Sequence, residues 1–244
     1  MRDDTVPALT SLCADLALAL RAAAHHGLAE GICNHFSVAL PDGSERFLIN
    51  PRGLHWSEVG ADDIVLVDRR GRVLAGRHGV EPTAMFIHAA VHRTARQAVV
   101  LHCHMPYATA LTLTRDRALD PTLSQNAMRF VDRIAVDAAY NGLALDEAEG
   151  ERIARAMQGK DVAFLGNHGV IVCGATVAHA YDDLYYLERA CLLQVLAQRS
   201  TGRALAPVAP ALASRVAAQT AGEREQSDLF FAALGRMLPP PSRP

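Results

Sequence analysis

The chain has 244 residues, half of them hydrophobic, and a formal net charge of −2. This is the composition of an ordinary globular protein, and the small net charge argues against nucleic acid or an anionic membrane surface as a partner. The sequence contains no uncharged apolar run of about 18 residues and no signal-peptide pattern, which predicts a cytoplasmic protein without a membrane span. The five cysteines lack C-x-x-C spacing, which argues against a disulfide framework and a structural zinc knuckle.

The first third of the chain predicts a helix followed by two hairpins. Helical periodicity runs from about residue 8 to 24, with Gly27 as the stop. Apolar runs at residues 36–40 and 46–50 flank a Pro-Asp-Gly-Ser turn, and runs at 64–68 and 72–75 flank Arg-Gly. Because hairpins outnumber crossovers here, we expect a largely antiparallel sheet.

A helix is expected at about residues 83–93, and it carries two histidines on one face. His88 and His92 are four residues apart, as in a zinc-protease motif, but Ala89 stands where that motif needs a glutamate. The sequence therefore argues against a metalloprotease.

The next apolar run, Val99-Val100-Leu101, leads into His102-Cys103-His104. Side chains two apart on a strand point the same way, so His102 and His104 are expected to share a face that Cys103 does not. A third histidine, His168, lies in Gly-Asn-His-Gly between two short apolar runs that read as a hairpin. Three imidazoles so placed can bind a divalent metal, and the alternative is that each only satisfies a hydrogen bond in the core.

The remaining elements are helices. They are expected at about 107–114, at 147–157 with Asp146 as N-cap, and at 177–198, capped by Thr176 and stopped by Gly202. The long helix carries an apolar stripe that predicts core packing rather than a cofactor site, formed by Tyr181, Leu184, Leu187 and Cys191. A helical stretch from 211 to 237 lies within a C-terminal extension at 207–238. We expect residues 1–244 to form a single domain.

Several motifs agree in order with one known family. They are Asn34-His35-Phe36-Ser37, Asn50-Pro51-Arg52-Gly53-Leu54, His88, Val100–Tyr107 and Asn167-His168-Gly169-Val170. Over about residues 8–200 the chain resembles the class II aldolase/adducin family, and the adducin-head-like and decarboxylase-like members more than the sugar-phosphate aldolases. The resemblance implies an α/β fold of three α/β/α layers around a mostly antiparallel sheet, and a homotetramer with sites near subunit boundaries.

The resemblance also implies a metal site. In the family's sugar-phosphate aldolases three histidines bind zinc, and their motifs fall on His102, His104 and His168. The metal polarises a carbonyl and stabilises the enediolate left when a C–C bond breaks. Zn²⁺ is the expected ion here, with Mn²⁺, Co²⁺ or Fe²⁺ as alternatives.

The chain departs from those aldolases at the acid/base position. They carry a glutamate four residues before the position of His88, where this chain has Ala84. Glu81 is the candidate replacement, although a charge at a helix start is also stabilised there by the helix dipole alone. Tyr107 is the second candidate catalytic residue, and packing of its ring is the alternative.

The binding of an anionic substrate is assigned to four residues. The phosphate loops of the family correspond to Asn34 and to Arg52-Gly53, and its serine pair is reduced to Pro82-Thr83. A guanidinium suits a carboxylate or a phosphate, so Asn34, Arg52, Gly53 and Thr83 are predicted to bind the anionic end of a small molecule. A surface charge at Arg52 and a turn at Asn34 are the alternatives.

These residues predict a divalent-metal-dependent carbon–carbon lyase. It would act by aldol cleavage or decarboxylation, through a metal-stabilised enolate, on a small hydroxy- or keto-acid or a sugar-phosphate-like substrate. One alternative is a non-heme Fe(II) oxygenase or decarboxylase acting on an aromatic or hydroxy acid, because an open site can hold O₂. Another is a non-catalytic interaction module like the head of adducin, whose basic tail has no counterpart in this sequence.

Overall fold

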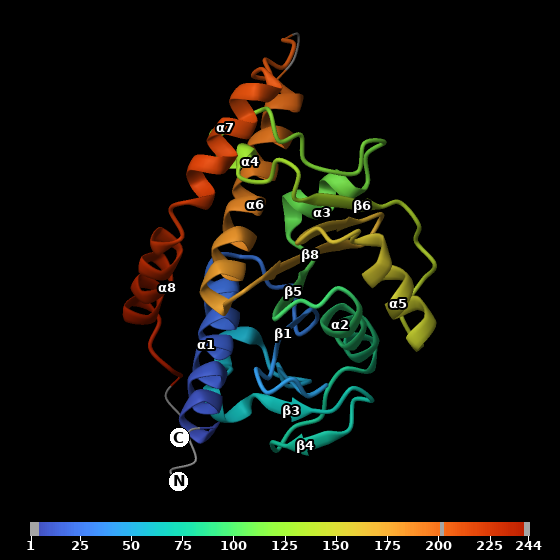
Figure 1. Cartoon of the computed structure of the whole chain (residues 1–244), viewed down its shortest axis with the longest axis vertical. Helices are drawn as coiled ribbons and strands as arrows, with labels where there is room; N and C mark the ends of the chain where they lie inside the picture. The colour runs from blue at the N-terminus through green and yellow to red at the C-terminus, as the bar shows by residue number, and fades with distance from the viewer. Residues whose placement is uncertain (1–4, 201–202, 242–244) are drawn as a thin grey trace.

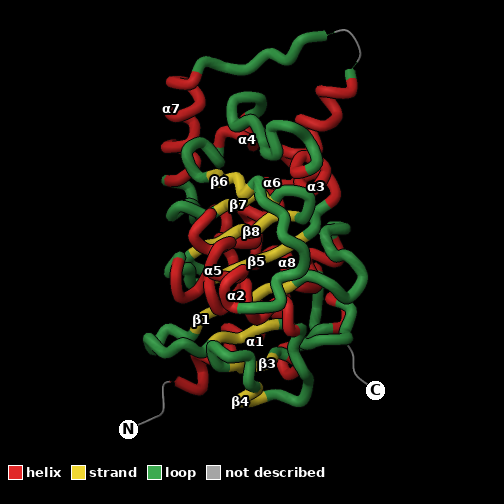
Figure 2. Tube along the Cα trace, turned by 90° about the vertical axis from the view of Figure 1, so that its right-hand side faces the viewer, coloured by secondary structure: helices red, strands yellow, loops and turns green. Residues whose placement is uncertain are grey.

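The computed structural model describes residues 5–200 and 203–241, and its centre is an eight-stranded sheet (Figure 2). The strand order is β4-β3-β2-β1-β5-β8-β7-β6. The strands are β1 His35–Ala39, β2 Phe47–Ile49, β3 Val65–Val67, β4 Val73–Ala75, β5 Val99–Cys103, β6 Ile134–Asp137, β7 Val162–Leu165 and β8 Gly169–Gly174.

All neighbouring strands are antiparallel except β6 and β7, which are parallel. The mostly antiparallel sheet is therefore confirmed. Strand β6 was not predicted, because four residues are too few to show an alternation of apolar and polar side chains.

Helices cover both faces of the sheet, which makes the three expected layers (Figure 1). One layer contains α1 (Thr5–His25), α3 (Pro106–Thr112) and α6 (Val177–Arg199), and the other contains α2 (Pro82–Thr94) and α5 (Glu147–Ala156). Strand β5 shows how the faces divide, since Leu101 and Cys103 pack in the first layer and Val100 in the second. His102, two residues after Val100, therefore faces the α2 and α5 side.

The structure confirms two predicted N-cap residues, each of which accepts a hydrogen bond at the start of its helix. Thr176 accepts a hydrogen bond from the backbone N–H of His179 at the start of α6, and Asp146 accepts one from Glu149 at the start of α5. The apolar stripe of α6 is fully buried, as expected for core: Tyr181, Leu184, Leu187 and Cys191. The helix ends at Arg199, and the predicted stop, Gly202, lies outside the described residues.

The C-terminal helical stretch is two helices rather than the single one predicted. Helix α7 (Pro210–Ala221) ends at Gly222, and α8 (Glu225–Met237) begins after a turn. Glycine is unfavourable inside a helix because it loses more backbone conformational entropy there than other residues, so Gly222 favours the end of α7. Helix α8 then packs against α6 and α1.

No helix in the described part of the chain is long and apolar enough to cross a membrane. One further short helix is α4 (Gln125–Met128).

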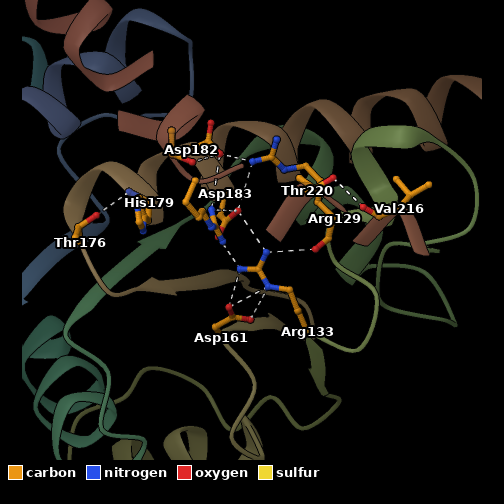
Figure 3. A network of polar contacts seen from close by, with 11 residues as sticks. Arg129, Arg133, Asp161, Thr176, His179, Asp182, Asp183, Val216 and Thr220 are labelled. Carbon is orange, nitrogen blue, oxygen red and sulfur yellow. Dashed lines mark hydrogen bonds and ion pairs between the residues drawn. The ribbon is translucent and has the colours of Figure 1, made fainter. Parts of the chain in front are cut away.

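Ion pairs join the C-terminal helices to the rest of the molecule. Arg224, the residue before α8, donates to both carboxylate oxygens of Asp183 on α6, at 3.0 and 2.8 Å. Figure 3 shows Arg133 between Asp183 and Asp161, and Arg129 contacts the neighbouring Asp182. Asp183 is buried, and the guanidinium groups of Arg133 and Arg224 that hydrogen-bond to it stabilise its charge.

Candidate metal centre

Three histidines meet where β5 ends beside the turn between β7 and β8. His102 lies in β5, His104 follows that strand, and His168 precedes β8, which is the neighbour of β5 in the sheet. One nitrogen from each imidazole lies within 4.8 Å of the other two, and the ring centroids are 4.8 to 5.1 Å apart. The structure thus brings the three predicted ligands together.

Close packing of β8 against the end of β5 requires a glycine. A Cβ on Gly169 would lie 2.7 Å from the carbonyl oxygen of Cys103 and 2.7 Å from Cδ2 of His104. Both separations are far below contact distance, so a side chain here would push the His168 turn away from His104. The Gly-Asn-His-Gly sequence therefore sets the spacing of the triad.

Two of the three imidazoles are oriented by acceptors outside the triad. Nδ1 of His102 donates to the carbonyl of Val170 at 3.0 Å, and Nδ1 of His104 lies 2.5 Å from a carboxylate oxygen of Glu30. These contacts leave the Nε2 lone pairs free, and Nε2 of His104 is buried without a hydrogen-bond partner among the described residues. A second partner on each ring is the usual way a protein orients histidine ligands.

The protonation state of the triad suits the binding of a cation. Burial and the neighbouring imidazole of His104 lower the pKa of His168 to about 4, and burial with the adjacent histidines lowers the pKa of His102 well below its ordinary value. Metal ligation requires neutral imidazole, so both rings are in the binding form at neutral pH. The geometry, the orphaned nitrogen and the donor set all fit a divalent ion such as Zn²⁺.

The triad forms one wall of a cavity of about 370 Å³. Asn34 is the most constrained of the predicted substrate residues on this wall. Its backbone is left-handed, with a φ of 74°, and its Oδ1 accepts a hydrogen bond from the backbone N–H of His104 at 3.1 Å. Its Nδ2 is buried without a partner among the described residues, so both N–H donors of the amide remain for a ligand.

Two of the other three predicted substrate residues line the cavity. Arg52 and Thr83 line it, and Gly53 does not. Glu81 also lines it, and its carboxylate is 3.0 Å from Nε of Arg52. The candidate base and the candidate anion-binding residue are therefore paired with each other.

Position 84, where the aldolases carry their glutamate, does not face the cavity in this chain. Thr83 and Ile87 line the cavity, whereas Ala84 is fully buried with Phe47 and Ile49 against the sheet. Position 84 is thus part of the core in this chain. Glu81, just before the helix, is the carboxylate that α2 brings to the cavity.

Tyr107 is not brought to the triad within one chain. It is absent from the described residues that line the cavity, and its ring packs against the core on the α6 side of the sheet. Its backbone N–H donates to the carboxylate of Glu188 at 2.8 Å.

Several residues of the site were not predicted from the sequence, among them Glu30, Tyr140 and His35. Glu30 contacts His104 from a loop and gives no local signal. Tyr140 lines the cavity with its ring centroid 6.3 Å from that of His168. His35 also lines the cavity, and its place beside Asn34 in the Asn-His-Phe-Ser motif is the signal that could have found it.

Comparisons with known proteins show the family of the chain. Residues 14–195 match the model of the class II aldolase and adducin N-terminal domain. An aldolase II superfamily protein from Pseudomonas syringae has a similar structure, with a TM-score of 0.87, 33% identity and coverage of 97% of this chain and 95% of that one.

Two Streptomyces enzymes are also similar in sequence. One is the 4-hydroxy-3-prenylphenylpyruvate oxygenase/4-hydroxy-3-prenylbenzoate synthase of Streptomyces roseochromogenus subsp. oscitans, which is 31% identical over 84% of this chain and 74% of its own length. The other is the decarboxylase NovR of Streptomyces niveus, which is 31% identical over 74% of this chain and 67% of its own. The chain therefore belongs to the class II aldolase and adducin family.

Proposed function

We propose that the chain is a divalent-metal-dependent lyase that breaks a carbon–carbon bond in a small hydroxy- or keto-acid, by aldol cleavage or decarboxylation. The observation that carries this proposal is the triad of His102, His104 and His168, whose nitrogens converge within 4.8 Å on the wall of a cavity. Zn²⁺ is the proposed ion. A bound divalent cation would supply Lewis acidity toward a substrate carbonyl.

The charges around the cavity favour a carboxylate substrate over a sugar phosphate. Arg52 is the guanidinium among the described lining residues, and Glu81 pairs with it at 3.0 Å. A phosphate dianion would find little uncompensated positive charge other than that of the bound metal. The free Nδ2–H of Asn34 would donate to an oxygen of the substrate, and Thr83 offers a hydroxyl on the same cavity wall.

Glu81 is the proposed proton acceptor. A substrate carboxylate that binds Arg52 would compete with Glu81 for the guanidinium, and would free the Glu81 carboxylate at the cavity. Tyr107 and Gly53 do not line the cavity within one chain. We propose that they contribute to the site only in the homotetramer.

Assembly and location complete the proposal. We propose a single domain over residues 1–244 with the 207–238 extension, a homotetramer with sites near subunit boundaries, and a cytoplasmic location. Ile32, Tyr140 and Leu143 are exposed apolar residues at the cavity, which supports a neighbouring subunit at its rim. Multi-angle light scattering measures the assembly directly.

The metal proposal is tested by elemental analysis of protein purified without chelator or affinity metal. We expect near-stoichiometric divalent metal in the wild type and a sharp loss in His102→Ala and in His168→Ala. His55→Ala is the matched control, because His55 is exposed and outside the cavity. Equal metal content in all four proteins would contradict the site, and absence of metal even after reconstitution would favour the adducin-like binding module.

The reaction is tested on a panel of hydroxy and keto acids by release of pyruvate or CO₂. Release that depends on the added metal and on His102 is the expected result. An Fe(II) oxygenase is the second candidate, because a relative similar over most of both chains is named as an oxygenase and the described ligand set holds no carboxylate. O₂ uptake with Fe²⁺, without aldol or simple decarboxylation products, would select that function.

A further inference from the structure

A line of hydrogen bonds runs between β1 and α2, next to the triad but separate from it. Oγ of Ser37 lies 2.5 Å from Nδ1 of His88 and 2.7 Å from Nε2 of His92. At the far end, Nδ1 of His92 lies 2.7 Å from the carbonyl oxygen of Gln97. The four-residue spacing of His88 and His92 on α2, which resembles part of a protease motif, thus serves to hold one serine.

The Gln97 carbonyl fixes the direction of every bond in this line. A carbonyl only accepts, so Nδ1 of His92 carries a proton, and in the neutral ring Nε2 is an acceptor. Ser37 must donate its single proton to that acceptor, and it then accepts from Nδ1–H of His88. Burial lowers the pKa of His92 to about 4 and that of His88 well below its ordinary value, so both rings are neutral.

The hydrogen bonds of this line leave Nε2 of His88 without a partner in the described part of the chain, next to the ring of His35. Nε2 of His88 and Nδ1 of His35 are both buried, and neither has a hydrogen-bond partner among the described residues. The two rings are neighbours, with centroids 5.9 Å apart and planes almost perpendicular at 88°. The two atoms are not hydrogen-bonded to each other in this structure, and each is costly to leave buried alone. A small approach of the two rings, with the proton on His35, would satisfy both.

We propose that this line fixes His35 with its proton on Nδ1, directed toward His88, and its Nε2 lone pair directed into the cavity as an acceptor for a substrate hydroxyl. His35 lines the cavity beside the triad and its ring stacks on that of His102. His35 is thus a specificity-determining residue, and Ser37, His88 and His92 are positioning residues. The substrate part of this inference rests on the proposed lyase function, whereas the proton positions do not.

The proton positions are tested by long-range ¹H–¹⁵N spectra of apo protein labelled with ¹⁵N-histidine, at pH 7.5. We expect His35, His88 and His92 to carry the proton on Nδ1, with each ring assigned from a single-substitution variant. Ser37→Ala should release His88 into a mixture of tautomers, and Ser214→Ala, an exposed change on α7, should leave the spectrum unchanged. A proton on Nε2 of His35 or His88 in the wild type would overturn the proposal.

Addition of Zn²⁺ separates His35 from the ligands. The Nε2 signals of the triad should shift, and that of His35 should keep the signature of an unprotonated nitrogen without metal. A shift of His35 Nε2 equal to those of the triad would make it a ligand and refute the proposed role.

The substrate contact is tested by calorimetry with two probes on the Zn²⁺-loaded protein. His35→Phe should weaken the binding of lactate about tenfold, the scale of one hydrogen bond, and change that of pyruvate less than about twofold. Equal losses for both probes would refute an acceptor role for His35. Failure of the wild type to bind either probe would contradict the proposed function, while the spectra would still decide the proton positions.

Discussion

At the scale of single residues, the triad depends on partners that are not ligands. Glu30 is the clearest, because its carboxylate lies 2.5 Å from Nδ1 of His104 while most of its side chain is exposed to solvent. Such a contact holds the ring with Nε2 toward the metal and increases the electron density on that nitrogen.

We therefore expect Glu30→Gln to weaken metal binding about 10- to 100-fold, the usual effect of removing such a partner. Competition with a chromogenic chelator measures the affinity. Glu223→Gln removes a charge from an exposed residue outside the cavity and should have no effect. Equal affinities in the wild type and Glu30→Gln would show that the carboxylate contributes nothing to the site.

At the scale of elements, the triad depends on the close approach of β8 to the end of β5. A Cβ on Gly169 would overlap the Cys103 carbonyl and the His104 ring, both at 2.7 Å. Gly169→Ala should lower the free energy of unfolding by about 1–3 kcal/mol, as an overpacked site does, and reduce the metal content.

Urea unfolding with Gly79→Ala as the control measures this effect. A Cβ on Gly79 meets nothing within 4 Å and its φ is not left-handed. The close-packing account of the triad fails if both variants unfold at the same urea concentration.

The docking of the C-terminal helices depends on the pair Arg224 and Asp183. In Arg224→Met, the buried carboxylate of Asp183 keeps Arg133 as its remaining hydrogen-bond partner. We therefore expect the free energy of unfolding to fall by about 1–3 kcal/mol. Arg215→Met, an exposed change on α7, is the matched control. Thermal unfolding by circular dichroism compares the two, and equal midpoints would show that the ion pair does not stabilise the docked helices.

At the scale of the whole molecule, the buried imidazoles make stability depend on pH. Burial lowers the pKa of His92 to about 4, with the Gln97 carbonyl acting in the opposite direction. Between the ordinary value of about 6.5 and pH 4, the unfolded chain binds a proton that the folded chain does not. The contribution of His92 therefore reduces stability as the pH falls through this window, by at most about 1.4 kcal/mol per pH unit.

The difference in unfolding free energy between wild type and His92→Gln isolates this contribution. Measured in chelator-treated protein, the difference should change steadily from pH 6.5 to pH 4 and be constant above pH 7.5. Ser214→Ala, an exposed change that removes no titratable group, should give a difference that does not vary with pH. Asp183 acts in a separate window, because its depressed pKa affects stability only as the pH falls through about 3.8 and below.

The sequence by itself determined the features that depend on local patterns. Alternation and turns located the hairpins, and the capping residues Thr176 and Asp146 located two helix starts. The separation of His102 from Cys103 on opposite faces of β5 also followed from the period of a strand. Motif order identified the family.

Only the tertiary structure decided which distant residues meet. Glu30 reaches His104 and Arg52 pairs with Glu81 through loops whose paths no local pattern encodes. The spacing of His88 and His92 excluded a protease motif but did not show their partner, which is Ser37 in a different element. Hydrogen-bond pairing across a sheet and a helix layer is a nonlocal property, because it is set by strand order and packing rather than by neighbours in the chain.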